Sequence, residues 1–188
     1  MLTGEAIHGT AMLKAAASLD TPVFHADHTV HRKGREAARS VLEARADSRL
    51  FERGVVNRLV VASGGNLRDL LQLAAQAADA ALLSGSQTVA PSHARAAIDR
   101  LRLEYTRRLG SGPFDPEEIP YEDKAQRLIR IYEGESSAAV PDAVLYSLLR
   151  STAVQKFNGT GCLGVHPLVV DLLKTQDRLP RSASGGTQ

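Results

Sequence analysis

The stretch SGGNLRDLL (residues 63–71) decides how the middle of this chain folds, because it combines a tight turn with the start of a helix. Its two glycines permit the positive φ angles of a turn, and Asn66 is a favoured N-cap. Asp69, three residues later, completes an acidic form of a capping box. Arg68 is unexpected, since the first turn of a helix already carries partial positive charge. It either meets an anion in front of the helix or points into water at a small cost.

Helical periodicity extends from this turn in both directions. It predicts four helices, at about residues 35–46, 52–62, 67–83 and 91–109. The alanines of the third helix allow a neighbouring helix to approach closely, and Pro91 suits the first position of the fourth helix. Before these helices, the periodicity predicts only a short helix near residues 11–18 and one short extended segment within residues 22–34.

The last third of the chain changes its organisation after the Pro- and Gly-rich segment at 110–120. Periodicity predicts helices at about 122–132 and 141–151. The alternating residues around Asn158-Gly159 predict a β-hairpin, and Pro167 opens a further short helix. Two helices, a hairpin and a short helix are the element order of a winged-helix domain.

Composition limits the class of protein. The 188 residues suffice for one domain or two small ones; 43% are hydrophobic and only 4% aromatic, which favours a mainly α fold with a small β-hairpin. A net charge of +2 permits nucleic-acid contact without arguing for it. The single cysteine, Cys162, excludes an internal disulfide. The sequence has neither a signal-peptide pattern nor an apolar run long enough for a membrane span, so we expect a soluble, cytoplasmic protein with no membrane partner.

Two series of residues resemble a known architecture. Residues 33–82 and 92–105, with the SGGNLRDLL turn among their helices, resemble the helical lid of AAA+ and STAND-like P-loop ATPases of the origin-recognition kind. Residues 148–173 (LLRSTAVQKFNGTGCLGVHPLVVDLL) resemble the winged-helix domain that usually follows this lid. The resemblance covers roughly residues 20–175. It implies five parts: the end of an ATPase core (1–33), the lid (34–110), a linker (111–120), the winged helix (121–175) and a disordered tail (176–188).

The resemblance also implies site residues. Arg68 matches the arginine called sensor 2, which contacts the γ-phosphate of ATP bound in the core, and Asn66 and Gly65 shape the cofactor-binding turn around it. In the winged helix, Arg150 and Lys156 are the candidate DNA contacts, together with Asn158 at the wing tip.

The chain departs from the family in one large respect. It has no G-x-x-x-x-G-K-[ST] motif and no apolar strand that ends in adjacent acids. We therefore expect that it binds ATP only together with a P-loop core supplied elsewhere, that it is not an ATPase by itself, and that it binds no metal alone. It is then the C-terminal part of a larger ATPase, or the product of a truncated or split gene, and its partner is a P-loop core or another protein.

Two other functions stay open. One is a free-standing winged-helix regulator that binds duplex DNA. Its second helix would present the exposed side chains Asp142, Tyr146, Ser147 and Arg150, and the preceding helix would add Lys124, Arg127 and Arg130. The other is a metal-dependent enzyme that uses His25, Asp27, His28 and His31, although no single regular conformation brings all four together. His166 is expected to end a strand and start the last helix, and Cys162 to be inert.

Overall fold

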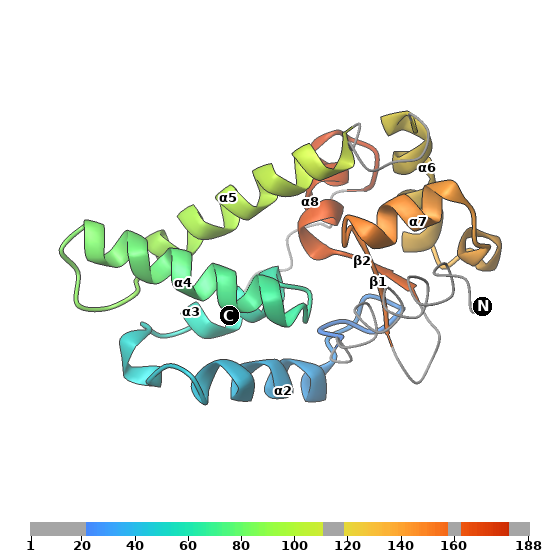
Figure 1. Ribbon diagram of the computed structural model, residues 1–188. Helices are drawn as coiled ribbons and strands as arrows, with labels where there is room; N and C mark the ends of the chain where they lie inside the picture. The colour runs from blue at the N-terminus through green and yellow to red at the C-terminus, as the bar shows by residue number, and fades with distance from the viewer. Residues whose placement is uncertain (1–21, 111–118, 158–162, 181–188) are drawn as a thin grey trace, which may run out of the picture.

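The protein is described by a computed structural model that covers residues 22–110, 119–157 and 163–180 (Figure 1). Several expectations lie outside these described residues: the helix near residues 11–18, the linker residues 111–118, the wing-tip residues Asn158 and Cys162, and the tail from residue 181.

The described chain is mainly helical and carries one small antiparallel hairpin, as the sequence predicts. In chain order its elements are α2 (Arg32–Glu43), the 3₁₀-helix η1 (Ser48–Leu50), α3 (Val55–Ala62), α4 (Leu67–Leu83), α5 (Pro91–Leu109), α6 (Tyr121–Tyr132), the 3₁₀-helix η2 (Ser136–Ala139), α7 (Ala143–Arg150), β1 (Val154–Lys156), β2 (Leu163–Val165) and α8 (Pro167–Thr175). β1 and β2 pair in the register Val154–Val165, Gln155–Gly164 and Lys156–Leu163.

The start of α2 differs from the prediction. The sequence predicts a helix from about residue 35, after an extended segment that ends at Gly34, yet α2 begins at Arg32. It begins earlier because the Nδ1 atom of His31 accepts a hydrogen bond from the Gly34 N–H and caps the helix. A Cβ atom at Gly34 would lie 2.0 Å from the carbonyl oxygen of Pro22. Glycine is therefore required by the close approach of the preceding segment. That segment is a tight loop with a single bridge between Phe24 and Val30, and it is not a regular strand.

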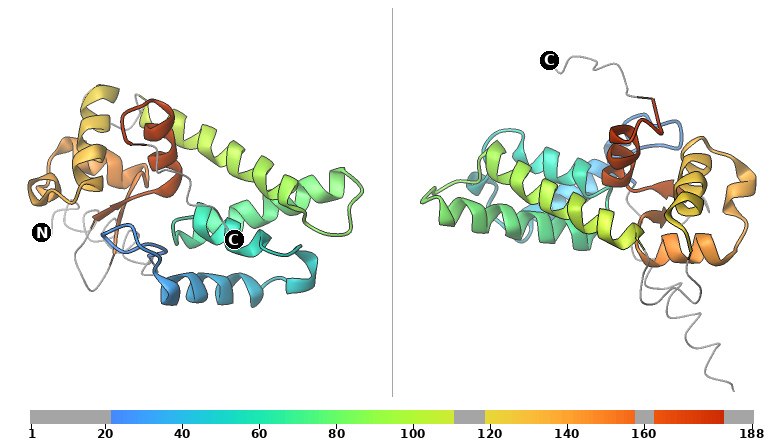
Figure 2. Two further views of the ribbon diagram at one scale, coloured as in Figure 1. Left: turned by 180° about the vertical axis from the view of Figure 1, so that it is seen from behind. Right: turned by 90° about the horizontal axis from the view of Figure 1, so that it is seen from above.

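The helices form two groups that share one core. α4 and α5 make a helical hairpin, and α2 and α3 pack against α4 (Figure 1). The hairpin β1–β2, α6 and α7 gather at the other end of the molecule, and α8 lies between the groups, against α5 and α3 (Figure 2). The buried apolar side chains of both groups belong to one continuous cluster, which includes Leu70 and Leu101 from the first group and Leu128 and Leu148 from the second.

Lys124 fixes α6 to the end of α5. Its side chain is 1% exposed, and its Nζ atom donates a hydrogen bond to the carbonyl oxygen of Gly110 at 2.9 Å. A buried ammonium group is tolerated only where it has such partners, so this contact holds the two groups together. The predicted boundary between lid and winged helix stays a prediction, and the structure adds that the two parts are packed against one another.

Candidate functional site

The turn between α3 and α4 is built from buried polar contacts. Gly64 and Gly65 have φ angles of +64° and +86°, the positive values that the sequence predicts. The Ser63 hydroxyl donates to the carbonyl oxygen of Val60 at 2.8 Å and accepts from the Gly65 N–H at 3.3 Å. Because both backbone and side chain of Ser63 are enclosed, the turn has a defined geometry and the start of α4 is held in place.

Asn66 is the N-cap of α4, as predicted. Its side chain is 3% exposed, and its Oδ1 atom accepts hydrogen bonds from the N–H groups of Arg68 at 3.0 Å and Asp69 at 3.2 Å. These two donors therefore have a partner within the turn. An anion in front of α4 would therefore receive fewer hydrogen bonds from backbone N–H groups than the sequence suggests. The side chain of Arg68 would have to supply most of the attraction.

The predicted capping box is wrong in its second half. The N–H group of Asn66 donates to the carbonyl oxygen of Ser63 at 2.9 Å, and Asp69 does not reach back to it. Asp69 instead points into the interior and is 1% exposed. Its Oδ2 atom accepts a hydrogen bond from the Tyr105 hydroxyl at 2.6 Å and lies 3.3 Å from Nε2 of His166.

His166 joins this turn to the last helix. It is the N-cap of α8 with Pro167 at the first position, as the sequence predicts, but its burial at 0% exposure is new. Its Nδ1 atom accepts from the Leu168 N–H at 3.3 Å, while Nε2 lies 3.0 Å from the carbonyl oxygen of Ser63. Since Nδ1 is an acceptor, a neutral ring carries its proton on Nε2 and donates it to Ser63 and Asp69.

Tyr105 completes the connection. Its ring stacks on that of His166 with 4.3 Å between centroids, and its hydroxyl lies 3.1 Å from Oγ1 of Thr152 in the link between α7 and β1. We call Asp69, Tyr105, Thr152 and His166 the junction. It brings together side chains from α4, α5, the α7–β1 link and the start of α8, so it connects the turn before Arg68 to the C-terminal group of elements.

The surroundings of Asp69 and Tyr105 shift the pKa values of both side chains. Burial raises the pKa of Asp69, but the hydrogen bond and the charge interaction with His166, the hydrogen bond from Tyr105 and the positive charge of Arg108 together outweigh burial and leave the pKa below its ordinary value. Burial, and then the charge and hydrogen bond of Asp69, raise the pKa of Tyr105 far above its ordinary value. Asp69 is therefore a carboxylate acceptor and Tyr105 a neutral donor.

Arg68 lies at the edge of this buried structure. It is exposed, and in the part of the chain that the structure describes its side chain forms no hydrogen bond or ion pair. The residues on either side of it in the turn are held: Asn66 by the N-cap and Asp69 by the junction. The arrangement offers a solvent-facing cation on a fixed backbone, which suits contact with an anion brought by another molecule or domain.

The predicted DNA-binding residues that the structure describes belong to the C-terminal group of elements. Arg150 ends α7 and Lys156 ends β1; both are exposed, while Asn158 lies outside the described residues. Of the four side chains expected on the exposed face of α7, Ser147 is buried and Asp142 caps the helix. The exposed face is therefore reduced to Tyr146 and Arg150.

The cations of α6 contribute less to this face than the sequence suggests. Lys124 is buried against Gly110. Arg127 forms an ion pair with Asp142, and Arg130 forms one with Glu135 at 2.7 Å. Because phosphate contacts supply most of the affinity for nucleic acid, these engaged side chains weaken the case for DNA binding by this face.

The histidines near the N-terminus have separate structural partners. The rings of His25 and His31 contact one another with 4.4 Å between centroids, and His31 also caps α2. The ring of His28 stacks on Tyr132, and Asp27 accepts hydrogen bonds from Thr29. Within residues 22–110, 119–157 and 163–180, no three His, Cys, Asp or Glu side chains are grouped to hold a metal ion.

Comparison of the chain with family models, curated proteins and solved structures found no match. Among the described helices, none combines the length and the apolar character needed to cross a membrane.

Proposed function

We propose that this chain is the lid and winged-helix segment of a P-loop ATPase, in which Arg68 senses the γ-phosphate of ATP. One observation carries the proposal: Arg68 is exposed and has no partner among the described residues, while the turn that bears it is buried and fixed. The sequence has no G-x-x-x-x-G-K-[ST] motif to hold the triphosphate, so in this proposal the nucleotide and its hydrolysis belong to a core supplied elsewhere.

The place of Arg68 in the first turn of α4 supports this role. Arg49 and the half-buried Arg102, Arg130 and Arg178 have carboxylate partners, whereas other exposed arginines, such as Arg39 and Arg58, have no partner among the described residues. Arg68 has none, although it lies where the peptide dipoles of α4 disfavour a cation. A phosphate group in front of α4 would remove that disadvantage and accept charge-assisted hydrogen bonds from the guanidinium.

The position of Arg68 next to the junction supports a coupling role. Asp69, its neighbour in the chain, contacts Tyr105 and His166, and His166 begins α8. A change in the position of Arg68 when it meets a phosphate would therefore be shared with the C-terminal group of elements. In this proposal the chain responds to ATP and transmits the response, and it performs no bond-breaking step itself.

The test is ATP turnover by this chain joined to the P-loop core with which it is encoded or purifies. Arg68→Ala should lower turnover about 10- to 100-fold, because a charge-assisted hydrogen bond contributes about 1.5–3 kcal/mol and 1.4 kcal/mol corresponds to a factor of ten. The matched control is Arg39→Ala, which removes an exposed arginine of α2 that also has no partner among the described residues.

The free energy of unfolding of both variants should stay within about 0.5 kcal/mol of the parent, as for other surface substitutions. Turnover and ATP affinity that are unchanged in Arg68→Ala would exclude the sensor role. A fall that is equal in the Arg39→Ala control would show a general charge effect, and would exclude it as well.

A further inference from the structure

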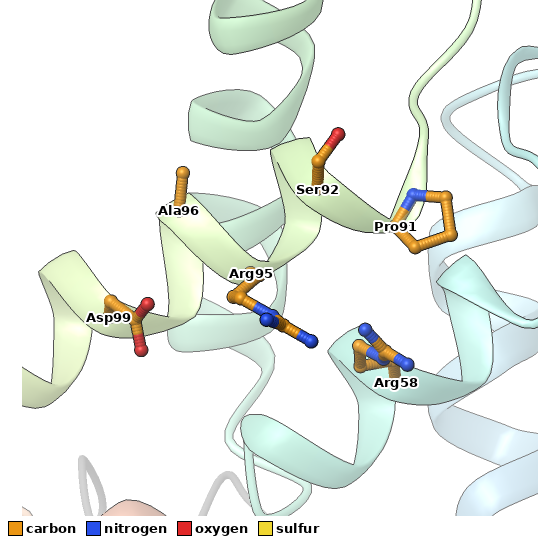
Figure 3. A pocket seen from close by; sticks show the side chains of 6 residues that line it. All are labelled: Arg58, Pro91, Ser92, Arg95, Ala96 and Asp99. Atoms are coloured by element: carbon orange, nitrogen blue, oxygen red, sulfur yellow. The ribbon is translucent and has the colours of Figure 1, made fainter.

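A second cationic feature lies away from Arg68, between α3 and α5. An open hollow of about 450 Å³ is lined by side chains of both helices: Arg58, Pro91, Ser92, Arg95, Ala96 and Asp99 (Figure 3). Arg58 comes from α3 and the others from the first half of α5. The helices pack against one another, so their backbones hold the two arginines at this hollow from opposite sides.

Neither arginine is paired with a carboxylate in the part of the chain that the structure describes. Both are exposed, and neither forms a hydrogen bond or ion pair with any residue that the structure describes. In Figure 3 the side chain of Arg95 extends toward that of Arg58. The carboxylate that lines the hollow, that of Asp99, is engaged by Arg102. Two like charges that converge without a counter-ion repel one another, and an anion between them converts this repulsion into attraction.

The start of α5 adds to the positive field. α5 has 19 residues and no acidic residue in its first turn, so the positive end of its peptide dipoles is not neutralised by a side chain of that turn. Ser92, in this first turn, is exposed, and in Figure 3 its side chain points away from the two arginines. This end of the helix alone would not define a site. It strengthens the field that the two guanidinium groups create.

We infer that this hollow binds a phosphate group, with Arg58 and Arg95 as its charged ligands. Two guanidinium groups offer ten N–H donors in planar forks, which match the several oxygens of a phosphate better than the two of a single carboxylate. The inference is independent of the role proposed for Arg68, because it involves different side chains on a different face of the helices.

The experiment titrates the chain with inorganic phosphate, ADP and a 12-base-pair DNA duplex at constant ionic strength, with the backbone amide signals of residues 92–96 as the NMR readout. The double variant Arg58→Ala/Arg95→Ala should bind inorganic phosphate about tenfold or more weakly than the parent, since each lost charge-assisted contact weakens binding several-fold. The control Arg39→Ala/Arg100→Ala removes the same charge from exposed arginines outside the hollow and should change the affinity less than about twofold.

The three probes identify the source of the phosphate. Tighter binding of ADP than of inorganic phosphate, with the same dependence on both arginines, assigns the site to a nucleotide. Tighter binding of the duplex with that dependence assigns it to a nucleic-acid backbone, and inorganic phosphate as the tightest of the three assigns it to a free phosphate ion. The inference is overturned if no probe shifts the amide signals, or if the control variant loses as much affinity as Arg58→Ala/Arg95→Ala.

Discussion

Replacing Asp69 with alanine is expected to lower the free energy of unfolding by about 3–5 kcal/mol, because two buried donors lose their acceptor at a cost of about 1–3 kcal/mol each. The change leaves the Tyr105 hydroxyl and the Nε2–H group of His166 without the carboxylate that they contact at 2.6 and 3.3 Å. Both groups are buried, so water does not replace the lost acceptor without opening the core. Urea denaturation followed by circular dichroism measures the loss.

Two further substitutions distinguish the loss of the junction contacts from a general effect of removing a carboxylate from α4. Asp79→Ala removes an exposed carboxylate from the same helix and should change stability by less than about 0.5 kcal/mol. Asp69→Asn keeps the shape and one acceptor oxygen and should cost less than Asp69→Ala. A loss below about 1 kcal/mol in Asp69→Ala, close to that of the control, would mean that the junction does not hold the two groups together.

The stability difference between the parent protein and Asp69→Asn should depend on pH. The pKa of Asp69 is below its ordinary value in the folded protein, so its ionised form stabilises the fold at pH values above the unfolded pKa of about 3.9. This contribution is lost as the pH falls through the folded pKa. The difference in unfolding free energy between the parent and Asp69→Asn should therefore be constant near pH 7 and shrink below about pH 4.

Gly64→Ala is the second large effect, at an expected cost of about 2–5 kcal/mol, the sum of a left-handed backbone penalty and overpacking. Gly64 has a φ angle of +64°, and a Cβ atom there would lie 2.6 Å from Cδ of Pro167. The proline ring is rigid and follows His166 of the junction, so it cannot move aside without disturbing that contact. Thermal and urea unfolding measure the cost.

The chain provides a matched control for this substitution. Gly54 has a similar φ angle of +83°, but a Cβ atom there would meet nothing within 4 Å. Gly54→Ala should therefore show only the backbone penalty, about 1–2 kcal/mol. Equal losses in the two variants would contradict the close packing of the turn against α8.

The local features of the fold were predictable from the sequence. The bounds of α4 agree with the prediction, because Asn66 caps its start and Ser84-Gly85 follows its end. The position of Pro167 at the start of α8 likewise depends on adjacent residues. Such features are set within a few positions of the chain, where the preferences of capping residues and proline apply directly.

The junction was not predictable, because its contacts join distant parts of the chain. Asp69 fits a local capping pattern, yet it pairs with Tyr105, 36 residues away, and with His166 in another group of elements. A signal was present: Asp69 lies on the same helical face as Leu73 and Ala77, both buried, which places a carboxylate among core positions. The cations of α6 were mispredicted for the same reason. The local sequence pattern suggests an exposed Lys124, and it does not reveal that the Lys124 Nζ atom donates a hydrogen bond to the carbonyl oxygen of Gly110.

Hydrogen exchange of the joined ATPase, measured with and without ATP, is the most direct test that Arg68 links a phosphate to the junction. ATP should slow amide exchange both in residues 63–70 and at the start of α8, residues 166–170, and Arg68→Ala should abolish both effects. Protection that is confined to residues 63–70, or that persists at both places in Arg68→Ala, would contradict the account.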